Sequence, residues 1–233
     1  MEIEEIKKRL KKKACLYCSE RIKNNNKNYE SWIGKVCYEQ KGEIYPVDEL
    51  GNEMIPLITL FIDNENYIPE SLKGIKLITI FVSVESLDHI DDENLDKWFC
   101  FRMYNNLENL VRCEYTSEEI KPCPLSVKYI DDDMPEKNDI EYIDEQLYDR
   151  IIELEDDEEI DYDNDIRNNS IMTHKIGGYP DSIQGDVGFD DGYEFVIEIT
   201  SDENAEFNII DFGNFYFGYN KNLDKWKVVC DFY

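Results

Sequence analysis

Two adjacent glycines constrain the folding of this chain more than any other feature of its sequence. Gly177 and Gly178 lie in residues 174–184, which read His-Lys-Ile-Gly-Gly-Tyr-Pro-Asp-Ser-Ile-Gln. Glycine accepts positive φ angles that other residues rarely adopt, and Pro180 fixes its own φ and restricts Tyr179 before it. The segment therefore predicts a specific turn rather than a linker, with at least one of the two glycines at positive φ.

Charge is the second constraint. The 233 residues include 53 acidic and 25 basic side chains, for a net charge of −28. A hydrophobic content of 42% and sixteen tyrosines nevertheless indicate a folded chain, which is long enough to bury a sizeable core. The charge excludes generic nucleic-acid binding and disfavours anionic membranes. A basic partner, a cation or plain solubility remain as explanations.

Neither the hydropathy nor the cysteines suggest export or a cofactor. The sequence has no apolar run of 18 residues, and its first residues are acidic and then basic without an apolar stretch, so we expect a cytoplasmic protein that does not cross a membrane. Cys15 and Cys18 have half the spacing of a zinc site, but no second pair follows. We expect buried, reduced thiols, with no metal and no cofactor.

Apolar periodicity predicts an α+β protein with mixed or antiparallel sheets and flanking helices. One helix is expected over residues 3–21, ending in Asn24-Asn25-Asn26, and a second over residues 138–154, with Asn138 as its N-cap. Strands are expected over residues 55–63, 75–84, 126–130, 193–200 and 212–219, and a hairpin over 97–104 and 110–115.

The order of these features predicts an internal duplication. In each copy a glycine turn precedes a strand that ends in an acid, and another glycine then opens an aromatic strand. The first copy contains Ser31, Gly34 and residues 56–63 and 74–82, and the second contains residues 174–178, 194–202 and 213–219. We therefore expect an N-terminal helix within residues 1–27 and two similar halves, residues 28–130 and 131–233.

The most acidic stretch, residues 155–165, allows two interpretations. Its carboxylates resemble the start of an EF-hand loop, but Ile166 and Met172 occupy the positions that need glycine and a bidentate glutamate, so we predict no metal site. The stretch is either a solvated loop or a surface that binds a basic partner. In the second case the partner-binding residues are Glu155, Asp156, Asp157, Glu158, Glu159 and Asp161.

Catalytic motifs are absent, including those of phosphate-binding loops, dinucleotide-binding folds, nucleophile elbows and zinc proteases. His89 and His174 are the only histidines and therefore the only conventional general-base candidates. No serine or cysteine stands in a recognised nucleophile context, so we favour a structural role for His174, orienting the glycine turn through hydrogen bonds to the backbone. We predict no catalytic residue.

The glycine-turn segment resembles the hallmark of the YwqG-like family, bacterial proteins of undefined function. The matching positions are His174, Lys175, Gly177, Gly178, Tyr179, Pro180 and Gln184. Residues 56–64 and 77–82 resemble two strands of the family, and the whole resemblance spans residues 28–220. An earlier Ser-Lys-x-Gly-Gly element of the family departs here to Ser31-Trp32-Ile33-Gly34-Lys35.

The resemblance implies a single α+β domain over residues 1–233 with an internal duplication, and it brings no known catalytic residue. Members are similar to components of polymorphic toxin neighbourhoods, in which acidic proteins neutralise toxins. We therefore expect a monomeric, non-enzymatic immunity protein that binds a basic toxin domain. Two alternatives remain: a module that binds a small molecule or peptide between the two halves, and an unrecognised hydrolase that uses His174.

Overall fold

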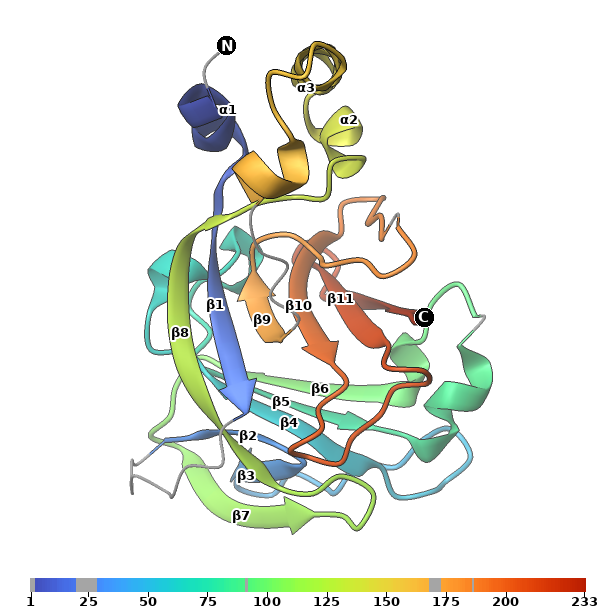
Figure 1. Ribbon diagram of the computed structural model, residues 1–233. Helices are drawn as coiled ribbons and strands as arrows, with labels where there is room; N and C mark the ends of the chain where they lie inside the picture. The colour runs from blue at the N-terminus through green and yellow to red at the C-terminus, as the bar shows by residue number, and fades with distance from the viewer. Residues whose placement is uncertain (1–2, 20–28, 91, 168–172, 186) are drawn as a thin grey trace.

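One large antiparallel sheet dominates the structure, a computed structural model that describes residues 3–19, 29–90, 92–167, 173–185 and 187–233 (Figure 1). Ten strands formed by these residues pair in the order β12-β11-β10-β9-β1-β8-β2-β4-β5-β6. Their bounds are β1 (Lys12–Ser19), β2 (Ser31–Ile33), β4 (Ile55–Phe61), β5 (Leu77–Val82), β6 (Phe99–Tyr104), β8 (Cys123–Asp133), β9 (His174–Gly177), β10 (Glu194–Thr200), β11 (Asn214–Asn220) and β12 (Lys225–Asp231).

The sheet bends so strongly that its two ends pack against each other. Phe101 of β6 stacks on Trp226 of β12 with their ring centroids 4.2 Å apart, and Phe99 meets Phe215 of β11 edge to face. The amide of Leu95, just before β6, also donates to the carbonyl of Val228 on β12 at 3.0 Å. The main hydrophobic core lies between these facing parts of the sheet.

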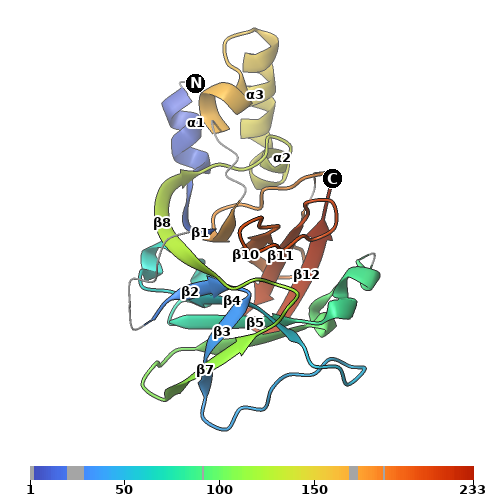
Figure 2. The ribbon, with the colours of Figure 1, turned by 60° about the horizontal axis from the view of Figure 1, so that its bottom comes forward.

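A small two-stranded sheet, β3 (Lys35–Gln40) with β7 (Leu110–Thr116), lies beneath β4 and β5 (Figure 2). Its buried Val36 packs with Phe81 of β5. The predicted hairpin of residues 97–104 and 110–115 is therefore wrong in its pairing, because β6 pairs with β5 while β7 crosses to β3.

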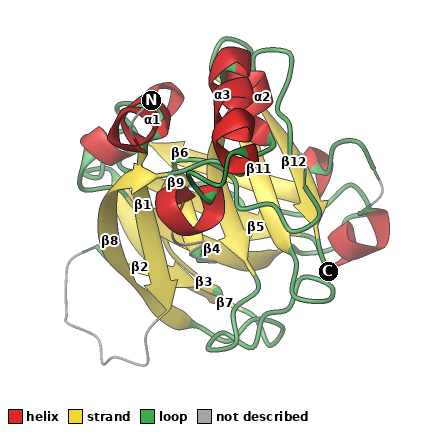
Figure 3. Cartoon of the chain, turned by 45° about the horizontal axis from the view of Figure 1, so that its top comes forward, coloured by secondary structure: helices red, strands yellow, loops and turns green. Residues whose placement is uncertain are grey.

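Helices gather at one end of the sheet and form a helical cap, comprising α1 (Ile3–Leu10), α2 (Asp139–Ile143), α3 (Glu145–Asp156) and a π-helical turn, Tyr162–Arg167 (Figure 3). The cap has a hydrophobic core of its own, which includes Ile6, Leu147, Ile151 and Tyr162. Short 3-10 turns elsewhere connect the strands: Glu65–Tyr67, Glu70–Leu72, Val84–His89 and Asp96–Trp98.

Two helix predictions need correction. The helix expected over residues 3–21 ends at Leu10, and residues 12–19 form β1, so residues 1–27 are not simply an N-terminal helix. The run Ala14–Cys18 carries apolar side chains at consecutive positions because β1 is a central strand between β8 and β9. The expected helix end at residues 24–26 lies outside the described residues.

The second predicted helix, residues 138–154, is two helices. Asp144 interrupts it with an extended backbone (φ −160°, ψ 83°), and its side chain accepts a hydrogen bond from the amide of Leu147. Asp144 is therefore the N-cap of α3, whereas Asn138 makes no side-chain cap. Residues 155–165 are likewise not one loop, since they include the end of α3 and part of the π-helical turn.

The predicted strands over residues 55–63, 75–84, 126–130, 193–200 and 212–219 are confirmed as β4, β5, β8, β10 and β11. The fold is α+β, and the pairings among the described strands are antiparallel. Within the described part of the chain, no helix is long and apolar enough to cross a membrane.

Candidate functional site

The glycine-turn segment enters the large sheet as β9, between β1 and β10. Gly177 has φ +78° and Gly178 has φ +71°, so the prediction of positive φ is confirmed at both positions. A Cβ on Gly178 would lie 1.9 Å from Oδ2 of Asp133. The second glycine is thus required by both its backbone angle and the close approach of a carboxylate.

Lys175, the residue of the motif between His174 and Ile176, is fully buried among carboxylates. Its Nζ lies 2.5 Å from Oδ2 of Asp181, 3.6 Å from Oδ2 of Asp133 and 3.7 Å from Oε2 of Glu198. Burial alone would lower the pKa of Lys175, but the three carboxylates outweigh it and raise the pKa above its usual value. Lys175 is therefore a charged lysine in the protein interior, held there by its acidic partners.

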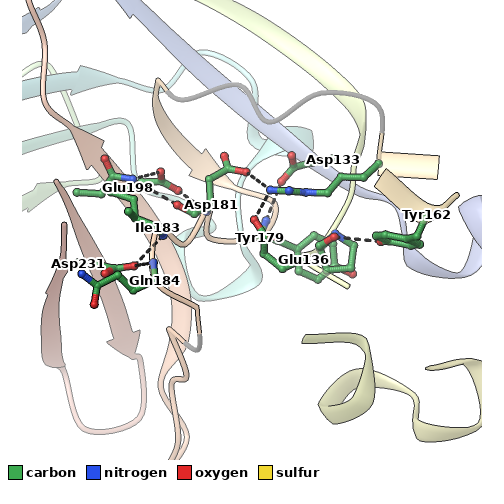
Figure 4. A network of polar contacts seen from close by, with 12 residues as sticks. Asp133, Glu136, Tyr162, Tyr179, Asp181, Ile183, Gln184, Glu198 and Asp231 are labelled. Atoms are coloured by element: carbon green, nitrogen blue, oxygen red, sulfur yellow. Dashed lines mark hydrogen bonds and ion pairs between the residues drawn. The ribbon is translucent and has the colours of Figure 1, made fainter. Parts of the chain in front are cut away.

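The segment after the glycines closes this cluster (Figure 4). The amide of Tyr179 donates to Asp133 at 2.7 Å, and the amide of Asp181 donates to Glu198 at 3.0 Å. Further along, the amides of Ile183 and Gln184 both donate to Oδ2 of Asp231 on β12. Carboxylates thus accept hydrogen bonds from four amides of the irregular backbone, which helps to explain how a loop can be buried here.

Arg167 extends the cluster into the helical cap. Its guanidinium pairs with Asp181 and with Glu136, which lies between β8 and α2. Tyr179 makes a second connection, since its hydroxyl donates to the carbonyl of Leu10 at the end of α1. The glycine-turn segment therefore fixes the cap to the sheet.

The cluster contains more carboxyl groups than cations. Four acids, Asp133, Glu136, Asp181 and Glu198, surround Lys175 and Arg167. Burial raises the pKa of Asp133, Glu136 and Glu198, although the neighbouring cations oppose the rise. The effect is largest for Glu198, which is fully buried and shares Lys175 with two other acids, so this carboxyl holds its proton more readily than an ordinary glutamate.

His174 is buried, and both of its ring nitrogens make hydrogen bonds to the protein. Nδ1 accepts from the amide of Thr200 at 3.1 Å, so the proton of the neutral ring lies on Nε2, which faces Oδ2 of Asp202 at 3.1 Å. Burial would raise the pKa of Asp202, but hydrogen bonds from His174 and Ser19 lower it to about 2. This arrangement leaves neither nitrogen available as a general base, and it joins His174 to the end of β10 and to Asp202 rather than to the backbone of the glycine turn.

His89 lies at the end of a 3-10 turn, where its ring stacks on Trp98 with a centroid separation of 4.4 Å. Cys15 and Cys18 both belong to β1, where residues three apart point to opposite faces of the sheet. The seven cysteines all lie in the described residues, three of them buried and four partly buried. No group of acids, histidines and cysteines in the described residues has the arrangement of a metal site.

The six predicted partner-binding acids divide into two groups. Glu155 and Asp161 are engaged within the cap: Glu155 pairs with Lys137 at 3.0 Å and accepts the amide of Tyr162, and Asp161 accepts two hydrogen bonds from Asn164. The other four, Asp156, Asp157, Glu158 and Glu159, are exposed at the end of α3.

The sequence did not reveal the acidic partners of Lys175, because carboxylates occur throughout the chain. One signal was present: Glu198 is the single charged residue in the apolar run Phe195–Thr200. A charge at such a position indicates a buried cation opposite it. No protein-family model matches the chain, and comparison with curated proteins finds no match either.

Replacement of Gly178 by alanine should destabilise the fold more than replacement of Gly74. Gly74 also has positive φ (+91°), but its added Cβ would meet nothing within 4 Å. Gly74→Ala should therefore cost about 1 kcal/mol, the backbone strain alone, as measured by chemical denaturation. Gly178→Ala should cost roughly 1–3 kcal/mol more, because Asp133 is tethered by Tyr179 and cannot move away freely. Equal losses would show that Asp133 adjusts without cost.

The stability difference between the wild type and Glu198→Gln should depend on pH. A carboxyl whose pKa is raised by folding stabilises the protein while it is protonated, and this contribution is lost as pH rises through the folded-state pKa. As the pH rises above 4.5, the ordinary pKa of a glutamate, the wild type should lose stability relative to the variant. The difference between their free energies of unfolding should change by at most about 1.4 kcal/mol per pH unit. Subtracting the free energy of unfolding of one protein from that of the other cancels the pH dependence that all their other acids contribute. A flat difference in urea titrations from pH 4 to 9 would show that Lys175 keeps Glu198 ionised.

Proposed function

We propose that this chain is a non-enzymatic binding protein, a cytoplasmic monomer that neutralises a basic toxin domain in the manner of an immunity protein. The observation that carries the proposal is the exposed acidic end of α3 in the helical cap. Residues 131–165 contain only Lys137 and Arg150 as bases, and Lys137 is already paired with Glu155.

The placement of these acids costs stability instead of adding to it. The C-terminal end of a helix carries partial negative charge, so carboxylates are unfavourable there. Glu153 and Glu155 of α3 have basic partners, Arg150 and Lys137, but α3 ends in Asp156, and Asp157, Glu158 and Glu159 follow directly. Glu158 also has a positive φ of 57°, an uncommon angle for a residue other than glycine. The helix end accounts for the positive φ at position 158, since the amide of Glu159 donates to the carbonyl of Leu154 at 2.9 Å, but it does not require carboxylates there, whereas binding of a positively charged surface does.

A basic toxin domain supplies that positive charge. An enzyme that cuts nucleic acid or binds nucleotides presents cations at its own active site, and an acidic inhibitor can cover them. Complementary charge of this kind accelerates association more than it strengthens the final complex. The interior cluster around Lys175 plays no direct part, since Lys175 and Glu198 are buried.

We further propose that the chain is an internal duplication of the YwqG-like kind. The strand order supports this, because β9-β10-β11-β12 on one side of the central β1–β8 pair corresponds to β2-β4-β5-β6 on the other. The fifth strand of the first unit is β8, which follows in sequence. The fifth strand of the second unit is β1, which comes from the N-terminal end of the chain.

Details of the two units support the same correspondence. Gly34 after β2 has φ +70°, as Gly177 at the end of β9 has +78°. Both units have a register shift at the same place, between Pro56 and Ile58 in β4 and between Phe195 and Ile197 in β10.

A side-chain contact is also repeated. The hydroxyl of Ser31 accepts a hydrogen bond from the amide of Phe61, and the ring of His174 accepts one from the amide of Thr200. In an experimental structure, residues 56–82 should therefore superpose on residues 194–219 with strand order and direction kept. Two unrelated arrangements would refute the duplication.

Neutralising the exposed acids of α3 should slow association with the toxin partner. The partner to test first is the product of the adjacent upstream gene, purified and inhibited by the wild-type chain. One variant combines four substitutions: Asp156→Asn, Asp157→Asn, Glu158→Gln and Glu159→Gln. Its association rate with the partner should be about tenfold or more below that of the wild type at low salt. Its salt dependence should also become shallower, while dissociation changes less. Stopped-flow mixing measures both rates. Glu155 is retained because it holds the cap together.

A matched control neutralises four exposed acids distant from the cap in sequence: Glu108, Glu114, Glu118 and Glu119. This variant has the same net charge as the first but should keep most of the association rate. If association slows equally in both variants, the net charge of the chain, and not the position of the α3 acids, determines the association rate. An unchanged rate in the α3 variant would leave its acids with a role in solubility alone.

A further inference from the structure

The loop between β3 and β4, residues 41–54, exposes three apolar side chains within seven residues. Ile44 is 85% exposed, Leu50 65% and Val47 56%. Single exposed apolar residues are ordinary, but several on one loop indicate a contact surface. The loop lies at the end of the molecule away from the helical cap (Figures 1 and 2).

The tip of this 41–54 loop is held in one conformation by Asp48. One carboxylate oxygen accepts the amides of Leu50 and Asn52, both at 2.9 Å, and the other accepts the side chain of Asn52. Gly51, at φ +89°, donates its amide to the carbonyl of Asp48 and completes the turn. Desolvation alone would raise the pKa of Asp48, but these hydrogen bonds and one from Ser83 outweigh it and lower the pKa.

The loop is also fixed to the large sheet and its neighbours, both at its tip and at its base. Ser83, which follows β5, donates its hydroxyl to Asp48 at 2.7 Å, and Arg102 of β6 donates to the carbonyl of Ile44 at 2.6 Å. The ring of Tyr45 packs edge to face against Phe81 and Tyr115, while its hydroxyl donates to the carbonyl of Met54. The loop is therefore anchored at its tip and its base.

This combination is what a binding loop requires. A loop already ordered before binding loses little conformational entropy on association, so more of the contact energy contributes to affinity. Side chains that are fully desolvated at the centre of a contact, surrounded by residues that exclude water, supply most of that energy. A loop that served only to connect β3 with β4 would need neither the anchoring network nor exposed isoleucine and leucine.

We propose that the 41–54 loop is a second interaction surface, which inserts Ile44, Val47 and Leu50 into an apolar pocket rimmed by basic residues on a partner protein. The basic rim follows from charge complementarity, because Glu49 and Glu53 are exposed beside the apolar side chains and only Lys41 opposes them within the loop. A net charge of −28 disfavours a second copy of the chain and an anionic membrane as occupants. The kind of partner, a basic protein, rests on the proposed function. The position of the surface on the 41–54 loop does not depend on the helical cap.

Site-specific photo-crosslinking in cells that naturally produce the chain tests this surface. Ile44, Leu50, Asp157 and Leu223 are replaced one at a time by p-benzoyl-phenylalanine, and adducts are identified by mass spectrometry. Leu223 is the matched control, a 59% exposed leucine in the turn between β11 and β12. Positions 44 and 50 should give one discrete adduct with a basic protein, and position 223 should give none.

The identified protein is then purified, and its affinity for four forms of the chain is measured by calorimetry. Leu50→Asp and Ile44→Asp should each weaken binding by about tenfold or more, whereas Leu223→Asp should stay within about twofold of the wild type. Thermal unfolding of each variant checks that the fold is intact. An intact fold is expected because all three replaced side chains are exposed.

Each outcome decides the inference separately from the proposed function. Adducts at position 157 but not at 44 or 50 would overturn the loop surface and support the cap. Loop adducts with a basic protein that is not a toxin would support the loop surface and contradict the proposed function. An adduct between two copies of the chain, an acidic partner, or no adduct at positions 44 and 50 would overturn the loop proposal.

Discussion

The structure depends on the burial of Lys175 with its carboxylates. Removing an ammonium ion from water is costly unless oppositely charged groups and hydrogen bonds replace the water, and three acids do so here. These acids come from β8, from the segment after the glycines and from β10. Arg167 and Glu136 connect the same cluster to the helical cap. A single buried cation therefore determines how the sheet, the glycine turn and the cap fit together.

This interior arrangement explains why the motif with the most specific sequence is not an exposed site. His174 and Lys175 are both buried, and both histidine nitrogens are bonded to Thr200 and Asp202. The two surfaces proposed for partner binding lie elsewhere, on the acidic end of α3 and on the 41–54 loop. The proposed binding function uses these surfaces, with the cluster as the scaffold that holds the cap in place.

The large negative charge is compatible with folding because most of the described acids face solvent, and the buried acids around Lys175 have cations beside them. Arg167 and Lys175 neutralise buried carboxylates, and Arg102 pairs with Glu43 at the base of the 41–54 loop. The uncompensated acids at the end of α3 are the exception that needs an explanation outside the folded chain. Their repulsion is relieved when a cationic surface covers them.

Local patterns in the sequence determined the α+β class, five of the strands and the positive φ of both glycines, because periodicity and the special angles of glycine depend on near neighbours. They failed where distant partners decided the outcome. The run Ala14–Cys18 became a strand because β8 and β9 lie on either side of it, and β7 left its expected hairpin to pair with β3. The partners of Lys175 were equally hidden, since Asp133 and Glu198 lie 42 and 23 residues away in a chain rich in carboxylates. Only the tertiary structure could select them, because the energy of a buried charge depends on which groups surround it in space.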